Sequence, residues 1–231
     1  MRILFITIQN PKYQGDYLEL SILHGLREIL GNNLVDIERK DVMYGDFHKV
    51  KKEDLHGRGF SLLSHPIKDI DTRKNIEDID FVIYGTGHAY GEMPFIEKYD
   101  KLAKHGSWIL DGHDLYGNAE IMKNYKGRKV IANQYRNSFK RELIFTDENV
   151  YPTGFGIPEE AIIEIDITKK NKLFQKTAPM RSVFRKETDL GGSRNHHIFD
   201  DEIEYYDDIS SSWFGLTCKK GGWDSLRHYE I

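Results

Sequence analysis

Short apolar runs separated by helical patterns occupy the first two-thirds of the chain, and this alternation most restricts how the chain can fold. Residues 3–8 form a near-continuous β-branched and aromatic run, typical of a strand covered on both faces. Strands separated by helices pair in parallel through right-handed crossovers, so the pattern predicts a Rossmann-like, doubly wound, mostly parallel α/β sheet. The further strands are predicted at residues 34–38, 80–84, 107–110, 129–132 and 150–155.

The first helix is predicted between Asp16 and Gly31. Asp16 with Glu19 three residues later forms a capping-box pattern, in which Asp replaces the usual Ser or Thr. Apolar residues then recur at helical spacing, and Gly31 suits the left-handed position that ends a helix. A second helix is predicted after Pro94, which suits a first helical turn. Residues 39–78 are polar, show no clean periodicity and are predicted to contain a loop or lid.

Four ionisable residues follow the third and fourth predicted strands: His88, Asp111, His113 and Asp114. In parallel α/β sheets the ligand crevice lies beyond the carboxyl ends of the strands. An Asp or His at this edge suits a general base that faces an acceptor hydroxyl, for which Asp111, His113 and His88 are the candidates. Two other interpretations are open. The four residues could bind a divalent metal that activates water, or Asp111 could cap the turn that it forms with Gly112.

Composition and charge limit the classes of partner. With a formal net charge of −4 over 231 residues, the chain is not expected to bind nucleic acid. No apolar run approaches the roughly 20 residues that span a bilayer. The single cysteine, Cys218, cannot form an internal disulfide, which predicts a reducing, cytoplasmic location. The charge run at residues 140–142 is interpreted as solvated surface, with an anion contact as the alternative.

Composition changes after Pro158, where a second domain is predicted. Residues 164–197 are polar and are predicted to be a linker or mobile loop. An acidic, aromatic helix is predicted from Asp200 to about Ser211. The predicted domains are therefore residues 1–160 and residues 164–231.

The last 18 residues, FGLTCKKGGWDSLRHYEI, predict a short buried strand, a basic glycine loop and the start of a helix. This arrangement suits phosphate binding, because glycine lets the backbone approach an anion and a helix N-terminus offers unpaired N–H groups. Glu230 lies about two helical turns from the glycine pair, roughly 10 Å, which is comparable to the span from diphosphate to ribose in a nucleotide. An ordinary surface pair between Arg227 and Glu230 is the alternative. The candidate phosphate contacts are Lys219, Gly221, Gly222 and Arg227.

This terminal sequence resembles the nucleotide-sugar half of GT-B glycosyltransferases, and it looks especially like small glycosyltransferase-like proteins of bacteria and phages. The pieces DLHGRGF at residues 54–60 and LDGHD at residues 110–114 are similar to the same group. The resemblance implies two Rossmann-like domains facing a cleft, with an acceptor half followed by the start of an incomplete α/β donor half. It also implies that Gly221 and Gly222 form the loop near the donor diphosphate and that Glu230 contacts the donor ribose.

The implied activity is transfer of a sugar from a nucleotide-sugar donor to a glycan or other hydroxyl acceptor, with no metal cofactor needed. Two alternatives are a truncated, catalytically inactive binding or scaffold protein and a metal-dependent hydrolase that uses His88 and His113. The chain is expected to stop within the donor-binding domain. Apolar surface at residues 213–216 would then be exposed and could drive formation of an oligomer.

Overall fold

The structure of the chain is a computed structural model. The described residues are 1–7, 17–46, 49, 51, 55, 60–62, 64–70, 73, 75–85, 99–112, 137–141, 149–176, 198–215, 217 and 226–231, with only the backbone described for residues 227 and 228.

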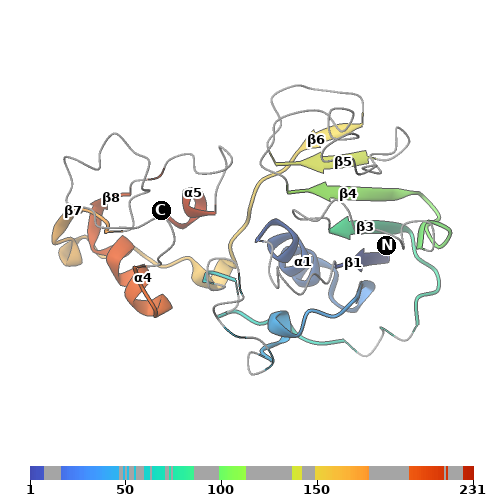
Figure 1. Ribbon diagram of the computed structural model, residues 1–231, viewed down its shortest axis with the longest axis horizontal. Coiled ribbons are helices and arrows are strands. Elements are labelled where there is room, and N and C mark those ends of the chain that lie inside the picture. The colour runs from blue at the N-terminus through green and yellow to red at the C-terminus, as the bar shows by residue number, and fades with distance from the viewer. Residues whose placement is uncertain are drawn as a thin grey trace.

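A six-stranded sheet in which every neighbouring pair is parallel forms the larger part of the structure (Figure 1). The strand order is β2-β1-β3-β4-β5-β6, so the order reverses at β1 and the carboxyl ends of β1 and β3 form a topological switch point. The predicted parallel α/β sheet is therefore confirmed at this level. The strands are β1 (Ile3–Ile6), β2 (Leu34–Ile37), β3 (Phe81–Gly85), β4 (Ser107–Asp111), β5 (Asn137–Lys140) and β6 (Val150–Pro152).

One strand of this sheet was not expected from the sequence. Five predicted strands correspond to β1, β2, β3, β4 and β6, although β6 ends at Pro152, before the predicted end. Strand β5 has a single large apolar residue, Phe139, between polar neighbours, so it lacks the signal of a buried strand. The strand predicted at residues 129–132 and the helix start at Pro94 lie outside the described residues.

Each face of the sheet packs into its own apolar cluster. Ile3 and Phe5 lie in one cluster, together with Leu23 of helix α1 (Tyr17–Leu30). Leu4 lies in the other cluster, together with Tyr99. This coverage of both faces explains why β1 is apolar at every position, since parallel strands are normally buried on both sides.

Helix α1 ends as the sequence predicts. Gly31 has φ +53°, a left-handed conformation that glycine adopts without steric cost. A short 3₁₀ helix, η1 (Gly31–Asn33), then leads directly into β2.

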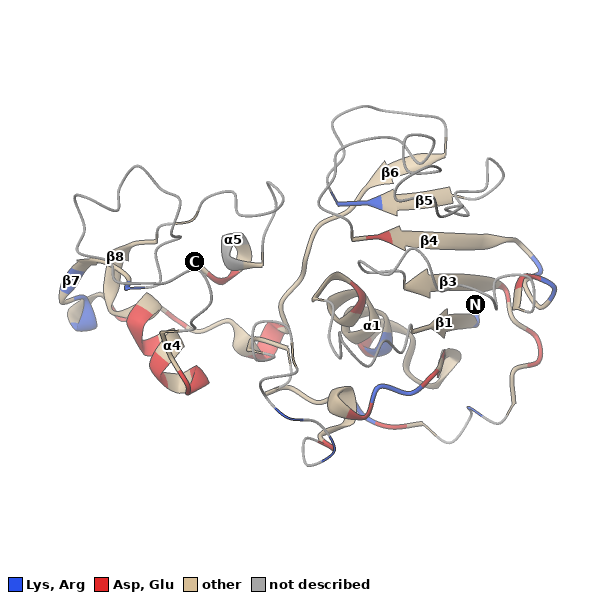
Figure 2. Cartoon of the chain, in the orientation of Figure 1, with Lys and Arg blue, Asp and Glu red and all other residues tan. Residues whose placement is uncertain are grey.

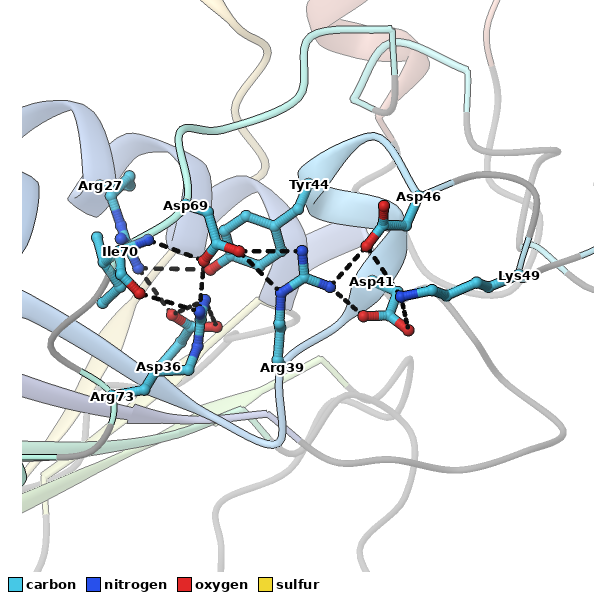
Figure 3. A network of polar contacts seen from close by, with 10 residues as sticks. All are labelled: Arg27, Asp36, Arg39, Asp41, Tyr44, Asp46, Lys49, Asp69, Ile70 and Arg73. Carbon is cyan, nitrogen blue, oxygen red and sulfur yellow. Dashed lines mark hydrogen bonds and ion pairs between the residues drawn. The ribbon is translucent and has the colours of Figure 1, made fainter.

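A network of ion pairs holds part of the segment after β2 against the edge of the sheet (Figure 3). Asp36 of β2 is fully buried and lies 2.8 Å from Nη2 of both Arg27 of α1 and Arg73. Further along, Arg39 lies between Asp46 and Asp69, at 2.9 and 3.1 Å. These ion pairs anchor described parts of the polar segment 39–78, which contains the 3₁₀ helix η2 (Asp41–Tyr44). Most of the loop or lid predicted at residues 54–60 lies outside the described residues.

A smaller group of elements follows the sheet. Two short strands pair in parallel, and helix α4 carries acidic residues along its length (Figures 1 and 2). Asp201 caps α4 by accepting hydrogen bonds from two backbone N–H groups, which confirms the predicted helix. The elements are η8 (Glu159–Ala161), η9 (Ile167–Lys169), β7 (Lys172–Phe174), α4 (Glu202–Ser210), β8 (Ser212–Phe214) and α5 (Arg227–Glu230).

The terminal strand differs from its prediction. It ends at Phe214 instead of beginning there, and Phe214 is 57% exposed, so the expected burial is wrong at this residue. Trp213, which precedes the predicted strand, is 56% exposed. Their exposure agrees with the expected apolar surface. The terminal helix is confirmed as α5. The boundaries at residues 160 and 164 stay predictions. Within the described residues, no helix has the length and apolar character needed to cross a membrane.

Candidate functional site

Three of the predicted site residues fall in the described part of the chain. Asp111 is the last residue of β4, and Arg227 and Glu230 are the first and last residues of α5. Nothing is described for the side chain of Arg227. The others lie outside the described residues: His88, His113, Asp114, Lys219, Gly221 and Gly222.

Asp111 forms a buried ion pair at the carboxyl edge of the large sheet. Lys140, the last residue of β5, lies directly opposite it in the strand register, and Lys140 Nζ is 3.2 Å from Asp111 Oδ2. The side chains are only 1% and 5% exposed for Lys140 and Asp111. Figure 2 shows the two charges at the ends of neighbouring strands. Asp111 is therefore placed at the predicted edge, with its charge compensated by Lys140.

The charge run that contains Lys140 is not solvated surface at its first two residues. Arg141 is buried as well, donates a hydrogen bond to the carbonyl oxygen of Gly112 at 3.2 Å, and lies 5.0 Å from the ring centre of Phe155. The surface interpretation is wrong for Lys140 and Arg141, because residues distant in sequence surround them. Asp111, Lys140 and Arg141 therefore form a compact group of charged side chains beside Gly112.

A second buried ion pair lies at the same edge. Glu19, in the first turn of α1, is 2.9 Å from Lys40 Nζ, and both side chains are almost completely buried. The Glu19 side chain crosses the end of β3 at Gly85, where an added Cβ would lie 2.5 Å from Glu19 Cγ. Sequence reasoning treated Glu19 only as a capping residue. Its placement at the switch point depends on the absence of a side chain at Gly85.

Glu230 lies where α4 and α5 meet Ser61 and Ser64. Its Oε1 accepts a hydrogen bond from the Ser61 hydroxyl, and its Oε2 accepts one from the Tyr205 hydroxyl. The Tyr206 hydroxyl in turn donates to Ser61 Oγ. Glu230 is only partly buried, so part of the residue faces solvent. We call Glu230 with Ser61, Tyr205 and Tyr206 the hydroxyl–carboxylate cluster.

A second carboxylate holds the same turn. Glu202, the first residue of α4, accepts hydrogen bonds from the Ser61 backbone N–H and the Ser64 hydroxyl. Phe60 packs on Tyr205 with ring centres 5.6 Å apart. Ser61 itself is fully buried and has φ +74°, a conformation that a non-glycine residue adopts only when its surroundings enforce it. The two glutamates supply those surroundings.

Two phenols near Glu230, those of Tyr17 and Tyr206, have a raised pKa, which favours their neutral form. Burial raises the pKa of Tyr17 well above its ordinary value, and the charge of Glu230 raises it further. Burial also raises the pKa of Tyr206, whose hydroxyl bonds Ser61. A neutral phenol keeps its O–H donor, so Tyr206 retains the hydrogen that it donates to Ser61 Oγ.

The described residues contain no group of three or more His, Cys, Asp or Glu side chains that could hold a metal ion. The predicted metal set cannot be assessed from them, because His88, His113 and Asp114 lie outside the described ranges.

Comparisons of the chain with models of protein families, with curated proteins and with solved structures gave no match. The resemblance to GT-B glycosyltransferases therefore depends on the motifs in the sequence alone.

Proposed function

We propose that the chain is a glycosyltransferase-like protein of the GT-B type, which transfers a sugar from a nucleotide-sugar donor to a hydroxyl acceptor. One observation carries the proposal: each oxygen of the Glu230 carboxylate accepts a hydrogen bond from a hydroxyl group, Ser61 on Oε1 and Tyr205 on Oε2. A ribose presents two neighbouring hydroxyls, which are donors of the same kind. The position chosen from the sequence for a ribose contact thus has the chemistry that such a contact requires.

Glu230 has the capacity to bind ribose while it keeps its present partners. An ionised carboxylate has about four acceptor positions, and the two hydroxyls use one on each oxygen. The two protein hydroxyls fix the orientation of the carboxylate. Because Glu230 is partly exposed, a ligand would compete with water for the remaining acceptor positions. Charge-assisted hydrogen bonds to a fixed carboxylate are stronger than bonds between neutral groups. Ser61 and Tyr205 therefore act as positioning residues for Glu230.

The donor phosphates would be held by the residues that precede Glu230. Lys219 and Arg227 supply positive charge, and Gly221 and Gly222 let the backbone approach the anion. In the transfer step, the acceptor oxygen bonds to the anomeric carbon of the sugar. The bond from that carbon to the phosphate oxygen breaks, and the nucleoside diphosphate leaves with the electron pair.

The acceptor would bind at the carboxyl edge of the large sheet, which we assign to a Rossmann-like acceptor half. The acceptor hydroxyl loses its proton to a base, for which His88, His113 and Asp111 are the candidates. Asp111 is compensated by Lys140 and is almost completely buried, which favours the histidines as the proton acceptor and a supporting role for Asp111. The strand order supports this assignment, since a crevice forms at a switch point.

Calorimetric titration with uridine, guanosine and thymidine diphosphates tests the donor site. We expect one of the three to bind, and Glu230→Gln to weaken binding at least about tenfold, because an amide replaces one charged acceptor with a donor. Glu204→Gln is the matched control, since Glu204 is an exposed acidic residue of α4 outside the cluster, and its affinity should equal that of the unchanged protein. Absence of binding by the unchanged protein would reject the proposal.

A second candidate, a nucleotide-sugar binding protein without transferase activity, is favoured by the buried Asp111–Lys140 pair. A carboxylate that is paired and almost fully buried is poorly placed to take a proton from a substrate. The two candidates differ in turnover. Binding of a nucleoside diphosphate without its release from nucleotide-sugars across a range of hydroxyl acceptors would favour the binding protein, whereas acceptor-dependent release would favour the enzyme.

A further inference from the structure

Helix α5 is too short to hold its own position. It has four residues, about one helical turn, and isolated helices shorter than about 12 residues are marginal in water. Its place in the fold is therefore set by contacts with other segments. Two of these contacts are made by Glu230, to Ser61 and Tyr205. A third comes from Ile231, which lies so close to Gly215 that an added Cβ there would overlap its side chain.

A fourth contact connects α5 to the large sheet. The ring of Tyr229 meets the ring of Phe155, with the ring centres 6.3 Å apart and the planes at 80°, an edge-to-face arrangement that aromatic pairs prefer. Phe155 lies on the segment that follows β6 and runs from the sheet to η8 (Figure 1). Tyr229 directly precedes Glu230, so this ring contact holds the helical turn that carries the candidate ribose carboxylate.

The segment that carries Phe155 is itself fixed to the carboxyl edge of the sheet. The Thr153 N–H donates to the carbonyl oxygen of Lys140 at 3.1 Å. The Arg141 guanidinium lies 5.0 Å from the Phe155 ring centre, within the range of a cation–π contact. The backbone N–H of Arg141 donates to the carbonyl oxygen of Asp111 at 3.2 Å. A continuous series of contacts therefore joins Asp111 to the helix that carries the candidate ribose contact.

We propose that Phe155 is a positioning residue for the nucleotide site: through Tyr229 it fixes α5, and with it the Glu230 carboxylate, relative to the sheet edge at Asp111. The identity of the ligand rests on the proposed function, whereas the hold of Phe155 on α5 does not depend on it. A nucleotide that binds Glu230 only while α5 is docked also stabilises the docked helix, because binding and docking are linked. Phe155 and the nucleotide therefore stabilise the same state of α5.

Hydrogen exchange of the full chain without ligand tests the hold of Phe155 on α5. The Tyr229 N–H donates to the Leu226 carbonyl oxygen at 2.9 Å, so its exchange reports the opening of the helical turn. Phe155→Leu keeps an apolar side chain but removes the ring, and it should speed this exchange at least about threefold while the amides of β1 exchange as before. Phe155→Tyr keeps the ring and should restore slow exchange.

Phe81→Leu is the matched control. Phe81 is another partly buried aromatic residue, and its ring centre lies 4.9 Å from that of Trp108. It begins β3, at the amino end of the strands, and so lies at the opposite edge of the sheet from Asp111. Its substitution removes an aromatic pair of the same kind but should leave exchange at Tyr229 unchanged.

The same amide tests the link to the ligand. Whichever of uridine, guanosine and thymidine diphosphate binds in calorimetry is added at about 100 times its dissociation constant. Exchange at Tyr229 should then slow by up to about a hundredfold, because opening of α5 requires release of the nucleotide.

Two results would overturn the positioning role. One is exchange at Tyr229 that is as slow in Phe155→Leu as in the unchanged protein, or that rises equally at the amides of β1, since either would deny Phe155 a local hold on α5. The other is a nucleotide that binds without slowing exchange at Tyr229. Absence of binding by all three nucleotides would reject the proposed function and the nucleotide site with it, and the exchange without ligand would still decide whether Phe155 holds α5.

Discussion

The carboxylate of Glu230 accepts a hydrogen bond from the hydroxyl of Ser61, although the two residues are 169 positions apart in the chain. This contact connects the terminal helix α5 to a turn that belongs to the first part of the chain. The carboxylate of Glu202, in α4, accepts a hydrogen bond from the backbone N–H of the same serine. Ser61 thus connects its turn to both C-terminal helices, and the candidate ribose contact is part of this connection.

Substitution of Ser61 should separate the hydrogen-bonding role of this residue from its backbone strain. Ser61→Ala removes the hydroxyl between Glu230 and Tyr206 and should lower the free energy of unfolding by about 1–3 kcal/mol. Ser61→Gly removes the same hydroxyl but suits φ +74°, so it should be about 1 kcal/mol less destabilising than Ser61→Ala. Urea unfolding of the three proteins measures both differences. Equal stability of the two variants would show that the left-handed backbone stores no strain.

Asp36 should be the most sensitive residue of the ion-pair network in Figure 3. Asp36→Ala leaves the guanidinium groups of Arg27 and Arg73 without their shared buried carboxylate, and the free energy of unfolding should fall by about 3–5 kcal/mol. Lys49→Ala in the exposed part of the same network should leave the free energy of unfolding nearly unchanged, because solvent screens exposed ion pairs. Thermal and urea unfolding would reveal both effects, and similar losses in the two variants would contradict this ranking.

Gly85 and Gly25 should respond oppositely to the same substitution. Gly85→Ala places a Cβ against Glu19 and displaces it from Lys40, which should destabilise the protein by about 1–3 kcal/mol. Gly25 lies inside α1, and an added Cβ would meet no neighbouring residue within 4 Å. Because alanine favours the helix more than glycine does, Gly25→Ala should stabilise the protein by about 0.5–1 kcal/mol. Denaturant midpoints measure both changes. A stable Gly85→Ala protein would mean that Glu19 can move without loss.

Alkaline pH should destabilise the protein through its buried phenols. Burial, followed by nearby carboxylates, raises the pKa of Tyr17 in the folded state, and the pKa of Tyr206 is also raised. A raised pKa contributes stability that is fully present below the unfolded value of about 10 and is lost as pH rises above it. The free energy of unfolding should therefore decline above about pH 10. Tyr206→Phe should make this decline shallower, and an unchanged slope would exclude Tyr206 as a source.

The regular elements could be predicted because their signals are local. The apolar run at β1 and the helical spacing that ends at Gly31 indicate which sides of these elements face the core. The structure has both the strand and the helix. Strand β5 was missed for the same reason, since Phe139 alone gives no periodic pattern. Lys140 and Arg141 read as surface residues because their charges are evident in the sequence, whereas their partners are not. Asp111 and Phe155 reach them only after folding.

The sequence alone determined the parallel α/β arrangement, the acidic helix α4 and the position of Glu230 in a terminal helix. Tertiary structure decided what these charged groups do: it paired Asp111 with Lys140, directed Glu19 across Gly85, and brought Ser61 and Tyr205 to Glu230. Periodicity reports the exposure of neighbouring residues on one element. Compensation of a buried charge depends on groups that are far apart in the chain, and their distance is set only when the elements pack.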